Sequence, residues 1–492
     1  MRLTPFQDFN ATLSIRPALI AFTTIYLVVP SLIFTWFWFR PEVSVVAVSL
    51  GIALATYHVV RSSQQPLLFQ ITLHGLLKLL ILAAAIVYFS GIGGFSIQSY
   101  DYWGHNTKFF ELANQPWPIS YGEAGTFACY YYGYYLVPAL LYKFFPGHLN
   151  WLVIIWSGLG IYLILIWYFL LFRRRLLAVS LFLLGGVPYL FFNAIPFYHG
   201  AIIQQHKLYF LGFAQAMLWQ PHQCIPAALL AAVMIHTTSF KLRYGLVCFL
   251  ACSCLVWGPF VSLGTLGIIF PAFIFEWVRG KGGCLLYKYW EKTDVLSFIY
   301  ILPLVVYFMS SNNRSGLATV ARSGPYWLIG YLIFLAVNLL CFFYLIMRSG
   351  KSGIRLSPLL ASAFCFLCLI SFFKIGLYND LVAKASMPAL FLIYFEIARL
   401  VSEQKAAQMR SRYFIVLNGL MFITIISTMD VLKKQFEHNA ATAYLLGTTF
   451  PVIPYHTYAN SYQMLKAKYT QTEALQYLGD TNSIYNRYLS PK

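Results

Sequence analysis

Residues 17–39, PALIAFTTIYLVVPSLIFTWFWF, contain no charged side chain. A helix of about 20 apolar residues crosses the roughly 30 Å hydrocarbon core of a bilayer while satisfying its own backbone hydrogen bonds. Similar runs recur along the 492-residue chain, which is 60% hydrophobic and only 10% charged, more apolar than a soluble core of this length requires. The sequence therefore predicts an all-α fold, a polytopic transmembrane helical bundle, and argues against sheet architectures.

Hydropathy predicts thirteen membrane spans and one apolar stretch that does not cross. The stretch is FACYYYGYYLVPALLYKFF at 127–145, whose six tyrosines, Pro138 and Lys143 suit a juxtamembrane or re-entrant helix at the headgroup level. It belongs to the first external loop, 90–150. The predicted spans are 17–39, 41–60, 67–89, 151–172, 176–195, 223–239, 244–257, 259–277, 295–311, 325–347, 356–376, 385–401 and 413–432.

The basic residues predict which side of the membrane each loop occupies. Cytoplasmic loops carry the excess of Lys and Arg, and more than half of the 34 basic residues fall in alternate loops. This alternation places the N-terminus in the cytoplasm and the loops 90–150 and 196–222 outside. The chain then divides into a transmembrane module, 1–432, and a short extracytoplasmic tail, 433–492. We expect a bacterial inner membrane or an equivalent one.

Composition also argues against several classes of site and partner. Short basic clusters between spans explain the net charge of +19, so membrane lipids are expected partners and nucleic acid is not. The nine cysteines lie mostly in apolar segments as small hydrophobes, and we predict neither a disulfide nor a metal site. The first apolar run continues into a second without a small-residue cleavage site, which argues against a cleaved signal peptide.

A polar stretch interrupts this apolar chain at 99–111, SYDYWGHNTKFFE. Asp101 and His105 are four residues apart and share one helix face, with Lys108 next along it. A carboxylate beside an imidazole can act as a general base with an orienting partner. Ser99 or Asp101 could equally cap the first turn of a helix, and the sequence leaves both roles open.

The order of features across residues 67–240 resembles the GT-C superfamily of membrane glycosyltransferases. A span is followed by an acidic external loop, a juxtamembrane helix, a span that ends in Arg173, Arg174 and Arg175, and a second outer loop. The YYYGYY run at 130–135 is also similar to a largely uncharacterised group of tyrosine-rich prokaryotic membrane proteins. The resemblance implies an inverting transfer of a sugar from a polyprenyl-phosphate-linked donor to an acceptor on the periplasmic or luminal face.

The resemblance also implies roles for the acidic stretch. Asp101 would be the general base, with His105 and Glu111 as further catalytic residues. Many members of the superfamily carry adjacent or alternating acids in this loop, whereas Tyr100 and Tyr102 flank Asp101. A hard cation needs converging carboxylates. We therefore expect no cofactor, although the sequence leaves a divalent cation open.

A leaving lipid phosphate requires fixed cations near the outer interface. Lys384 is the most prominent candidate, in YNDLVAKASMPALF from Tyr378, although its ammonium could simply extend to the headgroups. The expected phosphate-binding residues are Lys207, Arg314, Arg322 and Lys384.

Aromatic rings stack on sugars and polar side chains bind their hydroxyls, so WQPHQ at 219–223 predicts a sugar-binding wall. Trp219 could equally belong to the aromatic belt of the membrane interface. The expected substrate-binding residues are Trp103, Trp219, His222, Asn379 and Asp380.

Two other function classes compete with a transferase. Lys78 lies in the middle of the span 67–89, with His74 one turn before it, and charges at that depth are costly and often functional. These two residues favour a lipid or solute transporter or flippase as the alternative function. A third interpretation is a non-catalytic assembly subunit that keeps the same fold.

Overall fold

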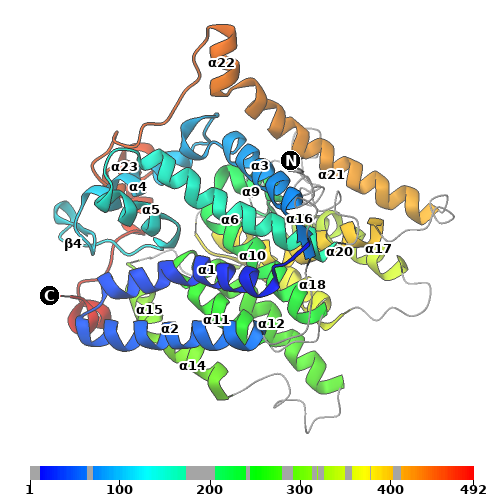
Figure 1. The fold of residues 1–492 in the computed structure, drawn as a ribbon, viewed down its shortest axis with the longest axis horizontal. Helices are drawn as coiled ribbons and strands as arrows, with labels where there is room; N and C mark the ends of the chain where they lie inside the picture. Colours follow the sequence, from blue (N-terminus) through cyan, green and yellow to red (C-terminus); the bar gives the residue numbers. More distant parts are fainter. Residues whose placement is uncertain are drawn as a thin grey trace, which may run out of the picture.

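The computed structural model describes most of the chain. The described residues are 12–63, 70–172, 206–239, 244–279, 292–312, 318–319, 326–349, 357–376, 378–402 and 412–491. The predicted span 176–195 lies outside them. Figure 1 shows the helices packed into one bundle, with the first external loop and the end of the chain gathered at the same side of the view.

The structure confirms the all-α class. Among the described residues, four helices are long and apolar enough to cross a membrane, Arg16–Trp38, Pro41–Ser62, Leu149–Leu171 and Trp327–Tyr344. The number of spans, thirteen, stays a prediction. The bundle helices are α1 (Arg16–Trp38), α2 (Pro41–Ser63), α3 (Leu73–Phe89), α6 (Leu149–Leu171), α10 (Pro221–Ser239), α11 (Gly245–Ser253), α12 (Pro259–Arg279), α14 (Lys292–Tyr300), α15 (Leu302–Met309), α16 (Trp327–Leu335), α17 (Cys341–Ser349), α18 (Pro358–Ser371), α20 (Met387–Ser402) and α21 (Arg412–Glu437).

Two of the predicted spans are interrupted. The segment predicted at 295–311 divides at Ile301 into α14 and α15, because Pro303 lacks the N–H needed to continue the preceding helix. The segment predicted at 325–347 passes through a π-helical turn at Ala336–Leu340 between α16 and α17. Hydropathy alone does not detect either interruption.

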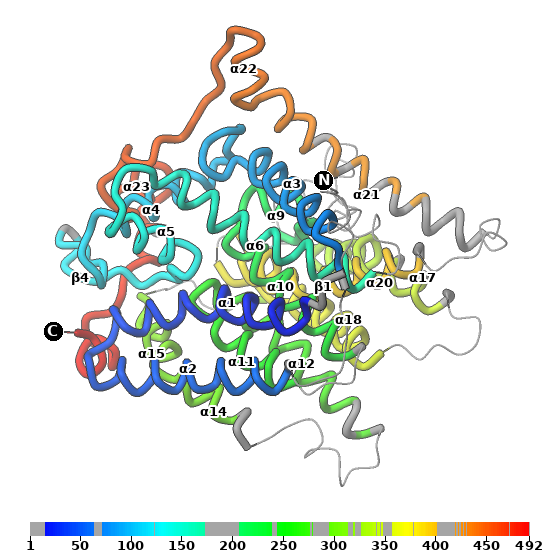
Figure 2. The backbone as a smooth tube through the Cα atoms, in the orientation of Figure 1, coloured from blue at the N-terminus to red at the C-terminus, as the bar shows by residue number. Residues whose placement is uncertain are grey.

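A tight connection makes α1 and α2 an antiparallel pair, side by side in Figures 1 and 2. The helix α1 ends at Trp38, and the chain reverses through Phe39 and Arg40 before α2 begins. The Ser44 hydroxyl donates to the carbonyl oxygens of Thr35 and Phe39 at 2.9 Å each, which satisfies backbone groups at the end of α1.

The strands are short hydrogen-bonded pairs rather than a sheet layer. In the described part of the chain, each strand has two or three residues and pairs antiparallel with one partner. The pairs are β1 (Thr12–Ser14) with β2 (Gln70–Thr72), β3 (Ser120–Tyr121) with β4 (Thr126–Phe127), and β5 (Ala318–Thr319) with β6 (Phe373–Lys374).

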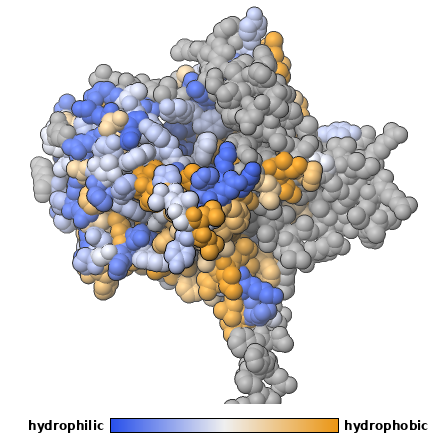
Figure 3. All heavy atoms as spheres, turned by 90° about the horizontal axis from the view of Figure 1, so that it is seen from above, coloured by the Kyte–Doolittle hydropathy of each residue, from blue (hydrophilic) through white to orange (hydrophobic). Residues whose placement is uncertain are grey.

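The first external loop contains two helices, α4 (Tyr102–Asn114) and α5 (Gly133–Phe144). The stretch predicted not to cross therefore forms a 12-residue helix. At 1.5 Å per residue it is about 18 Å long, too short for the hydrocarbon core. Figure 3 shows hydrophilic side chains gathered over this end of the molecule, with apolar side chains more frequent towards the bundle.

The tail packs against the first external loop instead of standing apart from it. Its helices are α22 (Ala440–Leu446), α23 (Ser461–Lys468) and α24 (Gln471–Leu475). Backbone bridges join Ser96 to Asn439 and Ala128 to Leu478. The Asn106 amide donates to the Ile453 carbonyl oxygen at 2.6 Å. The described tail residues, 433–491, are thus part of the same folded body as the loop.

Candidate functional site

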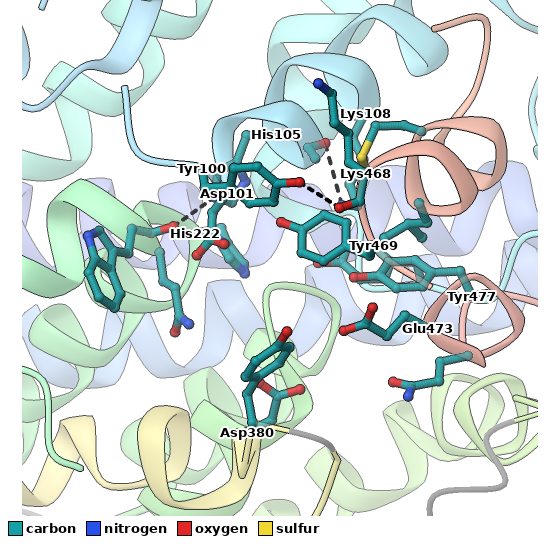
Figure 4. A pocket seen from close by; sticks show the side chains of 18 of the residues that line it. Tyr100, Asp101, His105, Lys108, His222, Asp380, Lys468, Tyr469, Glu473 and Tyr477 are labelled. Atoms are coloured by element: carbon teal, nitrogen blue, oxygen red, sulfur yellow. Dashed lines mark hydrogen bonds between the residues drawn. The ribbon is translucent and has the colours of Figure 1, made fainter. Parts of the chain in front are cut away.

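A cavity of about 700 Å³ lies where the first external loop, the bundle and the tail meet. Its wall combines α4, the tyrosines that precede α5, the junction of α9 (Phe213–Trp219) with α10, the short helix α19 (Asp380–Ala385), and the tail helices α23 and α24. Figure 4 shows Asp101 and His105 on one side, the tail residues Tyr469, Glu473 and Tyr477 on another, and Asp380 across from α4.

Asp101 lines this cavity from the N-cap position of α4. Its carboxylate makes no capping hydrogen bond with the described backbone of that helix. The Ser99 hydroxyl donates elsewhere, to the Leu218 carbonyl oxygen at 3.0 Å. The capping role that the sequence left open for these two side chains is therefore wrong, and the Asp101 carboxylate is available to a ligand.

The surroundings of Asp101 favour a proton acceptor. Burial raises the pKa of its carboxyl group, while the Lys384 ammonium lowers it, the Asp380 carboxylate raises it, and Lys108 and a hydrogen bond from the Tyr469 hydroxyl lower it. The net direction is upward. A general base works best when its pKa lies nearer the working pH, so this direction suits the role.

His105 faces the same cavity but bonds away from Asp101. Its Nε2–H donates to the Trp219 carbonyl oxygen at 2.9 Å, so Nδ1 accepts from the Tyr135 hydroxyl at 2.7 Å. Burial and the nearby Lys108 lower the pKa of His105 to about 3, which keeps the imidazole neutral. Both ring nitrogens of His105 are thus bonded to other groups, which does not fit an orienting partner of Asp101. His105 instead fixes α4 against α9.

Glu111, which was also expected to be catalytic, lies outside the lining of this cavity. Its carboxylate is buried and accepts a hydrogen bond from the Ser461 hydroxyl at 2.7 Å. Burial raises the pKa of Glu111 to about 7, against the opposing effect of this bond. The residue connects α4 to the tail helix α23.

Lys384 is directed into the cavity rather than towards lipid headgroups. Its ammonium lies 3.0 Å from the Asp380 carboxylate and donates to the Tyr131 hydroxyl at 3.2 Å. Burial by itself lowers the pKa of Lys384, but the Asp380 carboxylate together with Tyr131 and Tyr477 raises the pKa above its ordinary value. The predicted residues Lys384 and Asp380 therefore form an ion pair in the cavity wall.

The other predicted phosphate-binding residues are not in this wall. The Lys207 ammonium lies 6.0 Å from the Tyr378 ring centroid, outside the cavity lining. Arg314 and Arg322 lie outside the described residues. Of the four cations expected to bind phosphate, the structure brings one, Lys384, to the cavity.

The predicted sugar-binding residues divide in the same way. Trp219 and His222 line the cavity, and the His222 ring stacks on Tyr131 with ring centroids 5.6 Å apart. Trp103 lies outside and packs under the Lys468 ammonium at 4.0 Å. Asn379 adopts a left-handed conformation before α19, and its Oδ1 accepts from the Ile375 N–H at 3.4 Å. It shapes the turn that presents Asp380.

Sequence reasoning assigned no binding role to Lys108. This side chain is 3% exposed and lines the cavity, with its ammonium 4.4 Å from the Tyr130 ring centroid and 5.1 Å from that of Tyr477. Its position seven residues after Asp101 placed both on one helix face, and that periodicity was the available signal. The contribution of the tail had no comparable signal.

The two residues that favoured a transporter lie elsewhere. His74 and Lys78 are exposed on α3, and both are outside the cavity lining.

The fold and cavity define a helical protein with helices able to cross a membrane and a partly open, charged cavity at one end of the bundle. No protein-family model matches the chain, and no curated protein or solved structure is significantly similar to it. The functional argument therefore depends on the cavity.

Proposed function

We propose that this protein is a membrane glycosyltransferase similar to the GT-C superfamily. It moves a sugar from a polyprenyl-phosphate-linked donor to an acceptor hydroxyl on the periplasmic or luminal face. The observation that carries the proposal is the Asp101 carboxylate, free of a capping role, in a cavity that also contains the buried ammonium groups of Lys108 and Lys384. A proton acceptor and anion-binding groups in one cavity suit displacement of a lipid phosphate.

The reaction follows from these groups. The acceptor hydroxyl transfers its proton to Asp101 as its oxygen forms a bond to the anomeric carbon of the sugar. The bond between that carbon and the phosphate oxygen breaks, and the phosphate leaves with the electron pair. Direct displacement inverts the configuration at the anomeric carbon. A buried ammonium group in this cavity stabilises the charge on the departing phosphate.

The cavity wall also suits a sugar ring. The cavity is lined by the aromatic side chains of Tyr131, Tyr209, Tyr378 and Trp219 and by the amide of Gln220. Aromatic rings combine apolar faces with polar edges, and amide groups exchange hydrogen bonds with hydroxyls. Such a wall recognises a polar, uncharged ring.

The proposal includes the orientation of the chain. With thirteen spans and a cytoplasmic N-terminus, the loop 90–150 and the tail both lie outside. This is supported by their packing against each other at one end of the bundle, because contact requires that both emerge on the same side. The cavity then opens where the lipid carrier's phosphate resides.

Asp101→Asn tests the assignment. Purified protein in liposomes would be supplied with radiolabelled polyprenyl-phosphate hexoses and pentoses, and with a membrane extract as the source of acceptor. We expect the variant to lose transfer by about 10²- to 10⁴-fold, the usual contribution of a general base. The control is Glu437→Gln, an exposed carboxylate on α21 paired with Lys433 at 3.7 Å, which should transfer normally.

An Asp101→Asn protein that is folded and abundant yet transfers at the normal rate would show that Asp101 is not the base. Absence of transfer by the wild-type protein with every donor, together with loss of product in cells lacking the chain, would favour the non-catalytic subunit. Transport of the labelled lipid without transfer would favour the flippase.

A further inference from the structure

The two buried lysines of the cavity differ in how their charge is balanced. The Lys384 ammonium lies 3.0 Å from the Asp380 carboxylate. In contrast, no carboxylate among the described residues lies within 4.0 Å of the Lys108 ammonium. An ammonium group held away from water without a counter-ion is costly. Lys108 is therefore the buried cation of this cavity that still requires an anion.

The position of Lys108 leaves room for such an anion. Its ammonium donates one long hydrogen bond, 3.4 Å, to the Gly104 carbonyl oxygen of its own helix. An ammonium has three N–H groups, so two stay available for a ligand. The rings of Tyr130 and Tyr477 stack with centroids 4.7 Å apart and face the ammonium, which stabilises its charged form.

We propose that Lys108, beside the stacked Tyr130 and Tyr477, binds the phosphate group of the substrate, and that Lys384 instead holds Asp380 in place. The inference depends on the proposed function for its substrate, a polyprenyl phosphodiester. It assigns the phosphate to a residue of the first external loop, beside a tyrosine of the tail, rather than to α19. Lys108 and Asp101 then present the leaving group and the base from the same face of α4.

Binding through Lys108 is coupled to proton uptake. The net pKa of the Lys108 ammonium is lowered to about 7. Burial is the main cause of the lowering, the Glu111 carboxylate opposes it, Lys384 adds to it, and Asp101 opposes it. A bound anion stabilises the protonated form, so above about pH 7 each binding event takes up a proton. The titratable or charged groups that face Lys108 are Asp101, His105, Glu111, His222, Lys384, Tyr130, Tyr135 and Tyr477.

The test measures binding of methyl farnesyl phosphate to the full-length protein in nanodiscs. This phosphodiester carries one negative charge throughout the pH range of interest. Lys108→Met should weaken binding about 10- to 100-fold, the usual effect of removing a charged hydrogen-bond donor. The double variant Lys384→Met/Asp380→Asn removes the ion pair without changing the net charge, and should weaken binding by less than about threefold.

Lys466→Met is the matched control. Its ammonium also lies over a tyrosine ring, 5.4 Å from the Tyr462 centroid, but it is exposed and outside the cavity. This variant should bind like the wild type. Inorganic phosphate should displace the probe only at much higher concentration, whereas equal displacement would overturn the assignment to a lipid phosphate.

The pH dependence separates an anion-binding role from a structural one. Wild-type affinity should fall by up to about tenfold per pH unit above pH 7, as free Lys108 loses its proton. Lys108→Arg should restore binding and remove this fall, because a guanidinium stays charged.

The inference would be overturned if Lys108→Met bound the probe with wild-type affinity. It would also be overturned if the double variant at Lys384 and Asp380 lost as much affinity as Lys108→Met. Because the assay needs no transfer, retained activity in Asp101→Asn would refute the proposed function while leaving the Lys108 result intact.

Discussion

Asp101 occupies a position where aspartate usually stabilises a helix, yet its carboxylate is directed to a cavity. A capping hydrogen bond stabilises a helix by about 1 kcal/mol, and α4 begins without this contribution. Its first turn is instead held by backbone bonds and by the packing of the loop against the tail. A group that gives up a favourable local bond to face a charged cavity is expected to act on a ligand.

The surroundings of Asp101 predict a pH profile. A base must be deprotonated, so kcat/KM should fall as pH decreases through a pKa above the ordinary aspartate value. Lys384 lowers this pKa, so Lys384→Met should move the acid limb to higher pH. The measurement is kcat/KM against pH for the wild type, Lys384→Met and the control Lys466→Met. An acid limb that is identical in all three would contradict the role of Asp101.

Helix periodicity explains which residues of the acidic stretch line the cavity. His105 and Lys108 follow Asp101 by four and seven residues, so all three share one face and line the cavity. Glu111 follows by ten residues, which at 100° per residue turns it roughly 80° from that face. It therefore points to the tail. Lys108 lacked an assigned role because its missing counter-ion is a three-dimensional property.

At the scale of elements, hydropathy located the long helices closely. The spans expected at 17–39 and 151–172 are observed as Arg16–Trp38 and Leu149–Leu171. Hydropathy did not predict the tail helices, because they are short and polar and hydrophobic periodicity carries little information in such segments. Their place is set by contacts with residues about 350 positions away, such as Ser461 with Glu111.

The contact between Glu111 on α4 and Ser461 on α23 predicts that the stability of the protein depends on pH. Folding raises the pKa of Glu111 from 4.5 to about 7, so its contribution to stability is complete below pH 4.5 and is lost as pH rises to about 7. Glu111→Gln should remove that loss and stabilise the protein at pH 8 by about 1 to 3 kcal/mol. Ser461→Ala should destabilise it by about 1 kcal/mol.

Thermal unfolding midpoints between pH 5 and pH 8 measure both effects, with Glu437→Gln as the exposed control. A Glu111→Gln midpoint that declines with pH as steeply as the wild type would show that Glu111 is not the group responsible.

At the scale of the whole molecule, the cavity is assembled from distant parts of the chain. The first external loop supplies Asp101 and Lys108, α19 supplies Lys384, and the tail supplies Tyr477. Charge alternation in the sequence predicted that the loop and tail share one side of the membrane. It could not predict that they touch, because nothing in local pattern or composition reports a contact over such separation. The wall that the tail provides was therefore found only in the structure.

The central claim is that Asp101 faces an extracytoplasmic cavity that binds a lipid phosphodiester. The most direct test is labelling of Asp101→Cys by a membrane-impermeant maleimide in right-side-out vesicles, after replacement of the nine native cysteines. Asp480→Cys, on the exposed tail, serves as the control. The account predicts that both cysteines are labelled without permeabilisation and that methyl farnesyl phosphate protects only position 101. Labelling of position 101 only after permeabilisation, or no protection by the probe, would contradict it.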